Sequence, residues 1–316
     1  MKILKITTII LILVLLGGAG GYFVAEYRSD YLGAQTEKDL FKQRKADCLL
    51  LEQTLADEIS RFNGEVGIVV EDLDMNWKIS FNKDQLFPSA SLAKVPIMVA
   101  CFLAAEQGRI RLDQNIALKS SHKLTGSGVL KSMPAGTIFS VKRLIGLMIC
   151  DSDNTATNIL TDLLGIDYLN STFKTFGLKN TNLSRRIADY KSRSKGIENY
   201  TTAEDMALLL EKLYSKSLNS EYVSEQCISI MKLARSNDRI PRYLPAEASV
   251  AHKTGLERGV CHDVGVAYTS KGNFLISILT KHTNSNSQPS KTFIANASLH
   301  IYNYLEQVHT RSLKYE

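Results

Sequence analysis

The order of strand-like and helical patterns along the chain is the feature that most constrains its fold. Two strand-like runs lie within residues 65–81 and three within residues 249–281. Apolar residues at helical spacing precede the first set, at residues 48–62, and follow the second, at residues 291–308. The simplest packing joins all the strands in one five-stranded antiparallel sheet that the two terminal helices cover. The sequence therefore predicts an α+β fold.

The middle of the chain, about residues 84–245, is predominantly helical in pattern and is expected to form a second, all-α lobe. One long apolar helix is predicted over residues 89–107, where Gly108 would end it. Ser140 is placed to cap a second helix, and a third is predicted over residues 154–164. A small-molecule site is expected in the groove between the two lobes.

An uncharged apolar run at residues 6–25 follows two lysines at the N-terminus. Its length would span a bilayer as a helix, and the lysines favour an orientation with the remaining chain outside the cytoplasm. A cleaved signal peptide over residues 1–25 explains the same pattern, so both interpretations stay open. Either one exports the chain to the periplasm or cell surface. Residues 26–45 are polar and predict a linker, which leaves residues 46–316 as one domain.

Composition narrows the classes of partner and cofactor. Lys and Arg number 38 against 32 Asp and Glu, and the resulting net charge of +6 is too mild to predict nucleic-acid binding. A basic run at residues 185–195 is interpreted as a solvated loop. The five cysteines include no CxxC pair, and no cluster has the spacing of a metal site. We therefore expect no metal, no cofactor and a monomeric protein.

Ser91 and Lys94 form the first motif with chemical potential, within the segment FPSASLAKVPI. A serine hydroxyl is a weak nucleophile and needs a neighbouring base. Three residues make almost one helical turn, so the two side chains would share a face. Apolar surroundings and nearby cations favour the neutral amine of a lysine, which could then accept the serine proton. The spacing alone is common in helices, so this motif carries little weight by itself.

Ser152 and Asn154 belong to the second motif, Ser-Asp-Asn, which lies directly before the third predicted helix. The Ser152 hydroxyl could pass a proton to a leaving nitrogen, and the Asn154 amide could bind a substrate carbonyl. The same three residue types are also common at the start of a helix, and capping alone is the simpler explanation of this motif.

The third motif, Lys253-Thr254-Gly255, is predicted to end a strand. Lys253 and Thr254 supply a cation and a hydroxyl suited to a substrate carboxylate. Gly255 has no side chain, so a ligand could approach the strand closely. An edge position for this strand would leave the N–H of Leu256 free to bind an oxyanion.

All three motifs in this order resemble those of the class A β-lactamases and, more distantly, the penicillin-binding D,D-peptidases. The resemblance covers roughly residues 48–308 and implies the two-lobed fold inferred above. It implies hydrolysis of a β-lactam amide through an acyl-serine intermediate. The roles that it implies are nucleophile for Ser91, base or relay for Lys94, proton shuttle for Ser152, substrate amide for Asn154, carboxylate anchors for Lys253 and Thr254, and oxyanion donors for the N–H groups of Ser91 and Leu256.

One departure from that family affects the second half of the reaction. Class A β-lactamases carry a glutamate, usually within E-x-x-L-N, that activates the water releasing the acyl group. No such motif is present here, and spacing places the glutamate position near Ile187 or Ala188. Asp189 is the nearest carboxylate and Glu198 lies farther along. The sequence therefore predicts acylation by β-lactams with slow release. A cell-wall D,D-peptidase or esterase, or a penicillin-binding sensor, is the alternative function.

Overall fold

The computed structural model describes residues 42–312, except residues 75–76, 219 and 284–285. The predicted membrane segment or signal peptide at residues 6–25 lies outside the described residues, as does most of the predicted linker. Among the helices that the structure describes, none combines the length and the apolar character needed to cross a membrane.

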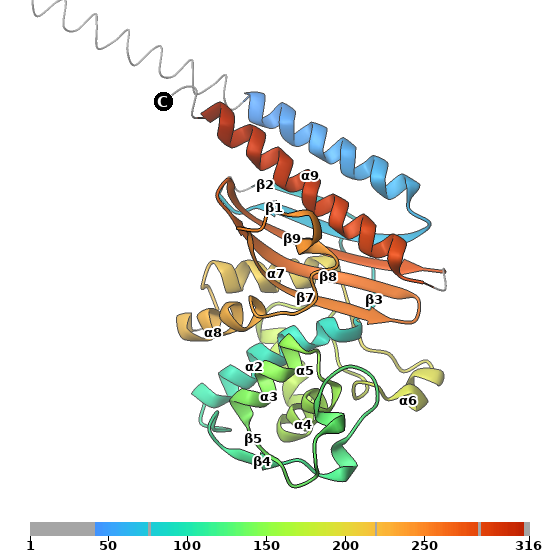
Figure 1. Cartoon of the computed structure of the whole chain (residues 1–316), viewed down its shortest axis with the longest axis vertical. Coiled ribbons are helices and arrows are strands. Elements are labelled where there is room, and N and C mark those ends of the chain that lie inside the picture. The colour runs from blue at the N-terminus through green and yellow to red at the C-terminus, as the bar shows by residue number, and fades with distance from the viewer. Residues whose placement is uncertain (1–41, 75–76, 219, 284–285, 313–316) are drawn as a thin grey trace, which may run out of the picture.

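A five-stranded antiparallel sheet joins the two ends of the domain, as predicted (Figure 1). Its strand order is β2-β1-β9-β8-β7, which leaves β7 at one edge. β1 and β9, which come from the two ends of the domain, pair antiparallel from Gly64 opposite His282 to Asp72 opposite Phe274. The strands are β1 (Gly64–Asp72), β2 (Trp77–Phe81), β7 (Ser249–Glu257), β8 (Val260–Thr269) and β9 (Gly272–His282).

Helices cover both faces of this sheet because its strands alternate apolar side chains toward two cores. On β1, Ile68 and Val70 enter a core shared with α9 (Gln288–Ser312) and the helix at residues 42–61, whereas Val69 enters the larger core of the second lobe. The two terminal helices lie side by side on one face, and α7 (Ala203–Tyr214) lies against the other (Figure 1). One of the central helices, α7, therefore also covers a face of the sheet.

The second lobe surrounds α2, whose residues from Lys94 to Ala104 are all buried. It also holds two short strand pairs, β3 with β6 and β4 with β5, so the expectation of an all-α lobe was wrong. These extended residues are too few to show a strand pattern in the sequence. The remaining elements are α2 (Lys94–Glu106), α3 (Val141–Cys150), α4 (Asn154–Leu164), α5 (Ile166–Thr175), α6 (Tyr190–Ser194), α8 (Glu221–Met231), β3 (Phe87–Pro88), β4 (Asn115–Ala117), β5 (Ile138–Ser140) and β6 (Tyr200–Thr201), with 3₁₀ turns η1 (Ala90–Ala93), η2 (Ser120–His122), η3 (Leu130–Ser132) and η4 (Ile240–Tyr243).

The helix predicted over residues 89–107 is divided into η1 and α2. Pro96 has no N–H, so it could not donate to the carbonyl of Leu92 as a continuous α-helix requires. Starting α2 at Lys94 puts Pro96 in the first turn, where the missing donor costs little. The predicted cap at Ser140 is confirmed, since its hydroxyl accepts a hydrogen bond from the N–H of Arg143 at the start of α3.

Candidate active site

The three motifs converge on one cavity between the edge strand β7 and the second lobe. Ser91 lies in η1, Ser152 lies in the connection between α3 and α4, and Lys253 lies on β7. All three line a cavity of about 340 Å³. Its other lining residues are Ser127, Ile149, Cys150, Asp151, Ala234, Arg235, Ser236, Asp238, Arg239, Thr254, Leu256 and Lys291.

Lys94 is completely buried at the first position of α2 and lies at the centre of the polar network. Its Nζ is 3.1 Å from Oγ of Ser91, 2.6 Å from the carbonyl oxygen of Ser152 and 2.9 Å from Oδ1 of Asn154. Burial, with a smaller contribution from the charge of Lys253, lowers the pKa of Lys94 well below its ordinary value. A neutral amine has two N–H groups, which can donate hydrogen bonds to the carbonyl oxygen of Ser152 and to Oδ1 of Asn154. Its lone pair is then left for a hydroxyl proton.

Ser152 connects the two lysines through its hydroxyl group. Its Oγ lies 2.9 Å from Oγ of Ser91, 3.0 Å from Nζ of Lys94 and 3.1 Å from Nζ of Lys253. Ser152 also has a φ of 52°, a left-handed conformation that is rare outside glycine and costs on the order of 1–3 kcal/mol. The surrounding hydrogen bonds hold this strained residue in place.

Lys253 is 2 % exposed and donates to Oγ of Ser152 and to the carbonyl oxygen of Thr254. Burial lowers its pKa to about 8, with Asp263 opposing that effect and Arg239 adding to it. Lys253 is therefore largely protonated at neutral pH. Its third N–H is available to a ligand in the cavity.

The predicted substrate-binding residues lie around the same network. The Oδ1 atom of Asn154 accepts from Lys94, while its Nδ2 makes only a long contact of 3.5 Å with the carbonyl oxygen of Thr125. Thr254 and Leu256 line the cavity. The edge position of β7 is confirmed, but the strand continues to Glu257, so the prediction that the third motif ends it was wrong.

Gly255 lies in a tightly packed position of the protein. A Cβ atom built on Gly255 would lie 3.0 Å from Cδ2 of His262 and 3.3 Å from Cγ of Leu92. The absent side chain therefore makes room for η1 and β8. Gly255 thus helps to bring η1, which carries Ser91, close to β7, and its predicted role of admitting a ligand stays a prediction.

Several charged residues of the cavity belong to no sequence motif, so their place in the site could not be predicted from the sequence. Arg239, only 3 % exposed, directs its Nε toward Sγ of Cys261 at 3.3 Å, within the cavity wall. Arg235 pairs with Asp151 at 2.7 Å, beside the second motif. These side chains come from an irregular segment between α8 and η4, where no periodicity indicates which residues face the site. Only the tertiary fold brings them to the motifs.

The two histidines that flank the third motif on β7 and β8 both have protein partners. His252 contacts Asp263 through Nδ1. His262 donates from Nε2 to the carbonyl oxygen of Pro88 and accepts at Nδ1 from the N–H of Thr280. Burial lowers the pKa of His262 to about 4, so the ring is neutral at physiological pH. Within the part of the chain that the structure describes, no group of three His, Cys, Asp or Glu side chains could hold a metal ion.

Comparison with known proteins agrees with the motif geometry. A model of the beta-lactamase enzyme family matches residues 50–305, which is most of the chain. The chain belongs to this family. Among curated proteins, β-lactamase VEB-1 of Pseudomonas aeruginosa is 24 % identical over 261 residues, covering 77 % of this chain and 86 % of its own length. β-Lactamase CARB-3 of the same organism is 26 % identical over 222 residues, or 68 % of this chain and 73 % of its own.

Solved structures place this β-lactamase-family chain in the class A serine fold. A β-lactamase from Sphaerobacter thermophilus superposes with a TM-score of 0.75 at 28 % identity, covering 81 % of this chain and 96 % of that one. A structure of PBP-A has the same TM-score and coverage at 29 % identity. An ancestral class A β-lactamase shares the fold, with a TM-score of 0.74 at 24 % identity and coverage of 80 % and 99 %.

The loop at residues 177–199, between α5 and β6, has polar side chains bound to one another or to the loop backbone, unlike the polar network around Ser91. Asn158 of α4 holds Ile187 by two hydrogen bonds: its Oδ1 accepts from the N–H, and its Nδ2 donates to the carbonyl. The Ile187 side chain is buried in the main apolar core, and Ala188 follows with a φ of 61°. The position that spacing assigns to the family's glutamate therefore carries an apolar side chain.

The two candidate replacement carboxylates are committed to other partners. Glu198 pairs with Arg185, whose Nε lies 3.0 Å from Oε1 of Glu198, and with Arg193 at 3.1 Å. Asp189 caps α6 by accepting from the N–H and the hydroxyl of Ser192. These contacts stabilise the loop, and whether either carboxylate replaces the glutamate stays a prediction.

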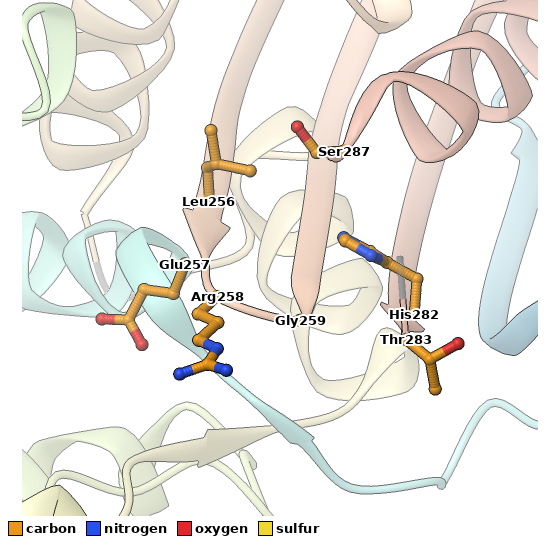
Figure 2. A pocket seen from close by; sticks show the side chains of 7 residues that line it. All are labelled: Leu256, Glu257, Arg258, Gly259, His282, Thr283 and Ser287. Atoms are coloured by element: carbon orange, nitrogen blue, oxygen red, sulfur yellow. The ribbon is translucent and has the colours of Figure 1, made fainter. Parts of the chain in front are cut away.

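A second cavity of about 700 Å³ lies beyond the end of β7 (Figure 2). It is lined by residues 256–259, His282, Thr283 and Ser287, and shares Leu256 with the first cavity. Neither Ser91 nor either lysine of the network lines it. This larger cavity therefore does not contain the reactive centre, although it adjoins the cavity that does.

Proposed function

We propose that Ser91 is the nucleophile of this class A serine β-lactamase-family enzyme and that Lys94 is its base. The observation that carries the proposal is the 3.1 Å contact between Oγ of Ser91 and a fully buried amine whose pKa is lowered. A neutral amine within hydrogen-bond reach can take the hydroxyl proton during attack.

In the acylation step, Oγ of Ser91 forms a bond to the carbonyl carbon of the β-lactam while its proton moves to Nζ of Lys94. The carbon–nitrogen bond of the ring then breaks. Ser152, which contacts both Lys94 and Ser91, delivers a proton to the leaving nitrogen. Lys94 is restored when its extra proton passes to Ser152.

We assign substrate binding to the residues around this network. Lys253 and Thr254 would hold the substrate carboxylate, with Lys253 carrying the charge. Nδ2 of Asn154 would donate to a side-chain carbonyl of the substrate, since its Oδ1 is already occupied by Lys94. The N–H groups of Ser91 and Leu256 would stabilise the oxyanion.

Release of the acyl group is proposed to be slow. Ile187 has no proton acceptor in its side chain, and the nearby acids bind arginines or a helix terminus. A water molecule at the ester would lack a well-placed base, and a base misplaced by about 1 Å can cost about a hundredfold in rate. Acylation itself is supported by a related structure: a PBP-A mutant in which a leucine is replaced by glutamate is an acyl-enzyme complex with penicillin G. It covers 82 % of this chain and 97 % of its own length at 28 % identity, with a TM-score of 0.76.

The same feature favours a second candidate function. An acyl-enzyme without a water-activating base suits an enzyme whose natural acyl group comes from a cell-wall peptide or ester, or a penicillin-binding sensor. Hydrolysis of a D-Ala-D-Ala peptide faster than hydrolysis of a β-lactam would identify the peptidase.

A time course with a chromogenic cephalosporin tests the proposal. We expect the wild-type chain to open about one equivalent rapidly and then to continue slowly, whereas Ser91→Ala should show no burst. Equal rates for both proteins would remove Ser91 from the mechanism.

We further propose that the domain acts outside the cytoplasm as a monomer on small molecules or wall peptides. The apolar run at residues 6–25 supports export as either an anchor or a cleaved signal. Cell fractionation with N-terminal sequencing of the mature protein tests this. Cytoplasmic protein with an intact N-terminus would contradict it.

A further inference from the structure

A buried acid–imidazole pair lies directly behind the proposed carboxylate-binding strand. His252 precedes Lys253 on β7, and its Nδ1 lies 2.9 Å and 3.0 Å from the two carboxylate oxygens of Asp263 on β8. The two side chains are 1 % and 0 % exposed. None of the roles proposed above uses either residue.

The backbone is shaped to bring His252 into this position. Gly265 is the register partner of His252 on β8, and a Cβ atom there would lie 2.5 Å from Cβ of His252 and 2.6 Å from the carbonyl oxygen of Ala251. No larger residue fits at position 265 without displacing this backbone. The glycine lets the imidazole pack against β8 and reach Asp263, two residues earlier on that strand.

Asp263 also connects this pair to the wall of the catalytic cavity. Its Oδ2 accepts a hydrogen bond of 3.1 Å from the N–H of Ile240, the residue that follows Arg239. In the sheet register Asp263 lies directly opposite Thr254. One carboxylate therefore ties together the strand that carries the proposed carboxylate anchors and the segment that carries Arg239.

The protonation of the pair follows from its contacts. A carboxylate that faces Nδ1 requires a proton on that nitrogen. Nε2 of His252 is buried and has no hydrogen-bond partner within the part of the chain that the structure describes. Asp263 therefore presents its carboxylate to an imidazole N–H and to the backbone N–H of Ile240, near the buried cations Lys253 and Arg239.

We infer that the Asp263–His252 pair positions Lys253 and Arg239 to recognise the carboxylate of an anionic substrate. The pair acts through those two cations and does not itself touch the reacting atoms. The inference rests on the proposed function only in taking the cavity around Ser91 as the substrate site. It adds the buried acid that neutralises and orients the cationic side of that cavity.

Other charged or titratable groups lie on the elements packed around the pair. Lys253 lies on β7, and Cys261 and His262 lie on β8. Arg239 and Asp238 precede η4, and Lys291 of α9 binds Asp238 at 2.7 Å. Asp238 lies 3.6 Å from Arg239, but its side chain is 43 % exposed, so Asp263 is the buried acid of the group.

The test compares penicillin G with its methyl ester, which lacks the negative charge, as acylating agents of the full-length chain. In Asp263→Asn we expect acylation by penicillin G to fall by up to about a hundredfold. Acylation by the ester should change much less, so the preference for the anion should shrink. The alkaline limb of the penicillin G profile should also move to lower pH, because Asp263 supports the proton on Lys253.

Two variants of His252 provide a matched control. Asparagine can present its amide N–H where Nδ1 of the imidazole lies, so His252→Asn should retain most of the preference for the anion. His252→Ala leaves Asp263 without that donor and should lose part of the preference. If Asp263→Asn does not fold, as judged by its thermal melt, this pair of variants decides the question alone.

Equal loss of reaction with both acylating agents would show that Asp263 has only a structural role, and would overturn the inference. So would a His252→Ala variant that keeps the full preference. Failure of the wild-type chain to react with either agent would instead contradict the proposed function, so the two failures are distinguishable.

Discussion

The hydroxyl network around Ser91 and the loop at residues 177–199 are both polar, but their polar groups serve different purposes. In the network, the amine of Lys94 and the hydroxyl of Ser152 contact Ser91 and each other, and the amine of Lys253 contacts Ser152. In the loop, the carboxylate of Glu198 binds Arg185 and Arg193, which fixes the loop's shape. In the proposed mechanism, acylation and release therefore depend on separate groups, and we propose that this chain has a complete set for the first step only.

The first prediction concerns the acylating side and has the largest expected effect. Lys94→Met keeps the length of the side chain but removes the base, so acylation by penicillin G should slow by about 10²–10⁴-fold. Stopped-flow measurement of acylation gives the rate. Lys142→Met, at an exposed position of α3, is the matched control and should react like wild type. A small effect of Lys94→Met would show that another group accepts the hydroxyl proton of Ser91.

The second prediction concerns the stability of the loop. Glu198→Gln removes one charge from a buried ion pair and should lower the free energy of unfolding by about 3 kcal/mol, because Arg185 is left without its main partner. Urea denaturation measures this. Asp113→Asn breaks the exposed pair with Arg111 and should leave stability unchanged. Equal effects in both variants would show that the loop pair is no more important than a surface pair.

The third prediction supplies the missing group to the loop. Ile187→Glu should speed release of the penicilloyl group by about a hundredfold, since a general base contributes at least that much when positioned. Ile187→Gln has the same size without the base and should not speed release. The decay of the acyl-enzyme, followed by intact mass, is the measurement. Faster release in both variants would assign the effect to loosening of the loop.

The fourth prediction is a pH profile that separates the two lysines. Acylation by penicillin G should rise with pH through the lowered pKa of Lys94, because the base must be neutral. It should fall above about pH 8, where Lys253 loses the charge that binds the carboxylate. Lys253→Arg should abolish the alkaline limb, since a guanidinium stays protonated. If the alkaline limb persists in this variant, a group other than Lys253 causes it.

Much of the fold could be predicted because its signals are local. The strand runs alternate apolar residues, and Ser140 marks a helix start that the structure confirms. The full extent of β7 could not be predicted, since Thr254 and Gly255 resemble a strand end. Pairing of Glu257 with Val260 continues the strand despite that local signal.

The site could be predicted in its centre but not at its rim. Ser91, Lys94, Ser152 and Lys253 occur in short motifs whose spacing has a chemical meaning, and the structure brings all four together. Arg239 and Asp263 belong to no motif. Arg239 reaches the cavity, and Asp263 lies behind its wall, only because β7, β8 and the segment before η4 meet in space, which is a tertiary outcome.

The most direct test of the central claim is intact-mass spectrometry of the full-length chain mixed with penicillin G, sampled from milliseconds to hours. We predict rapid formation of one covalent adduct, mapped to Ser91 by peptide analysis, that persists long after acylation is complete. Complete turnover of the penicillin with no adduct detected at any time would contradict the account.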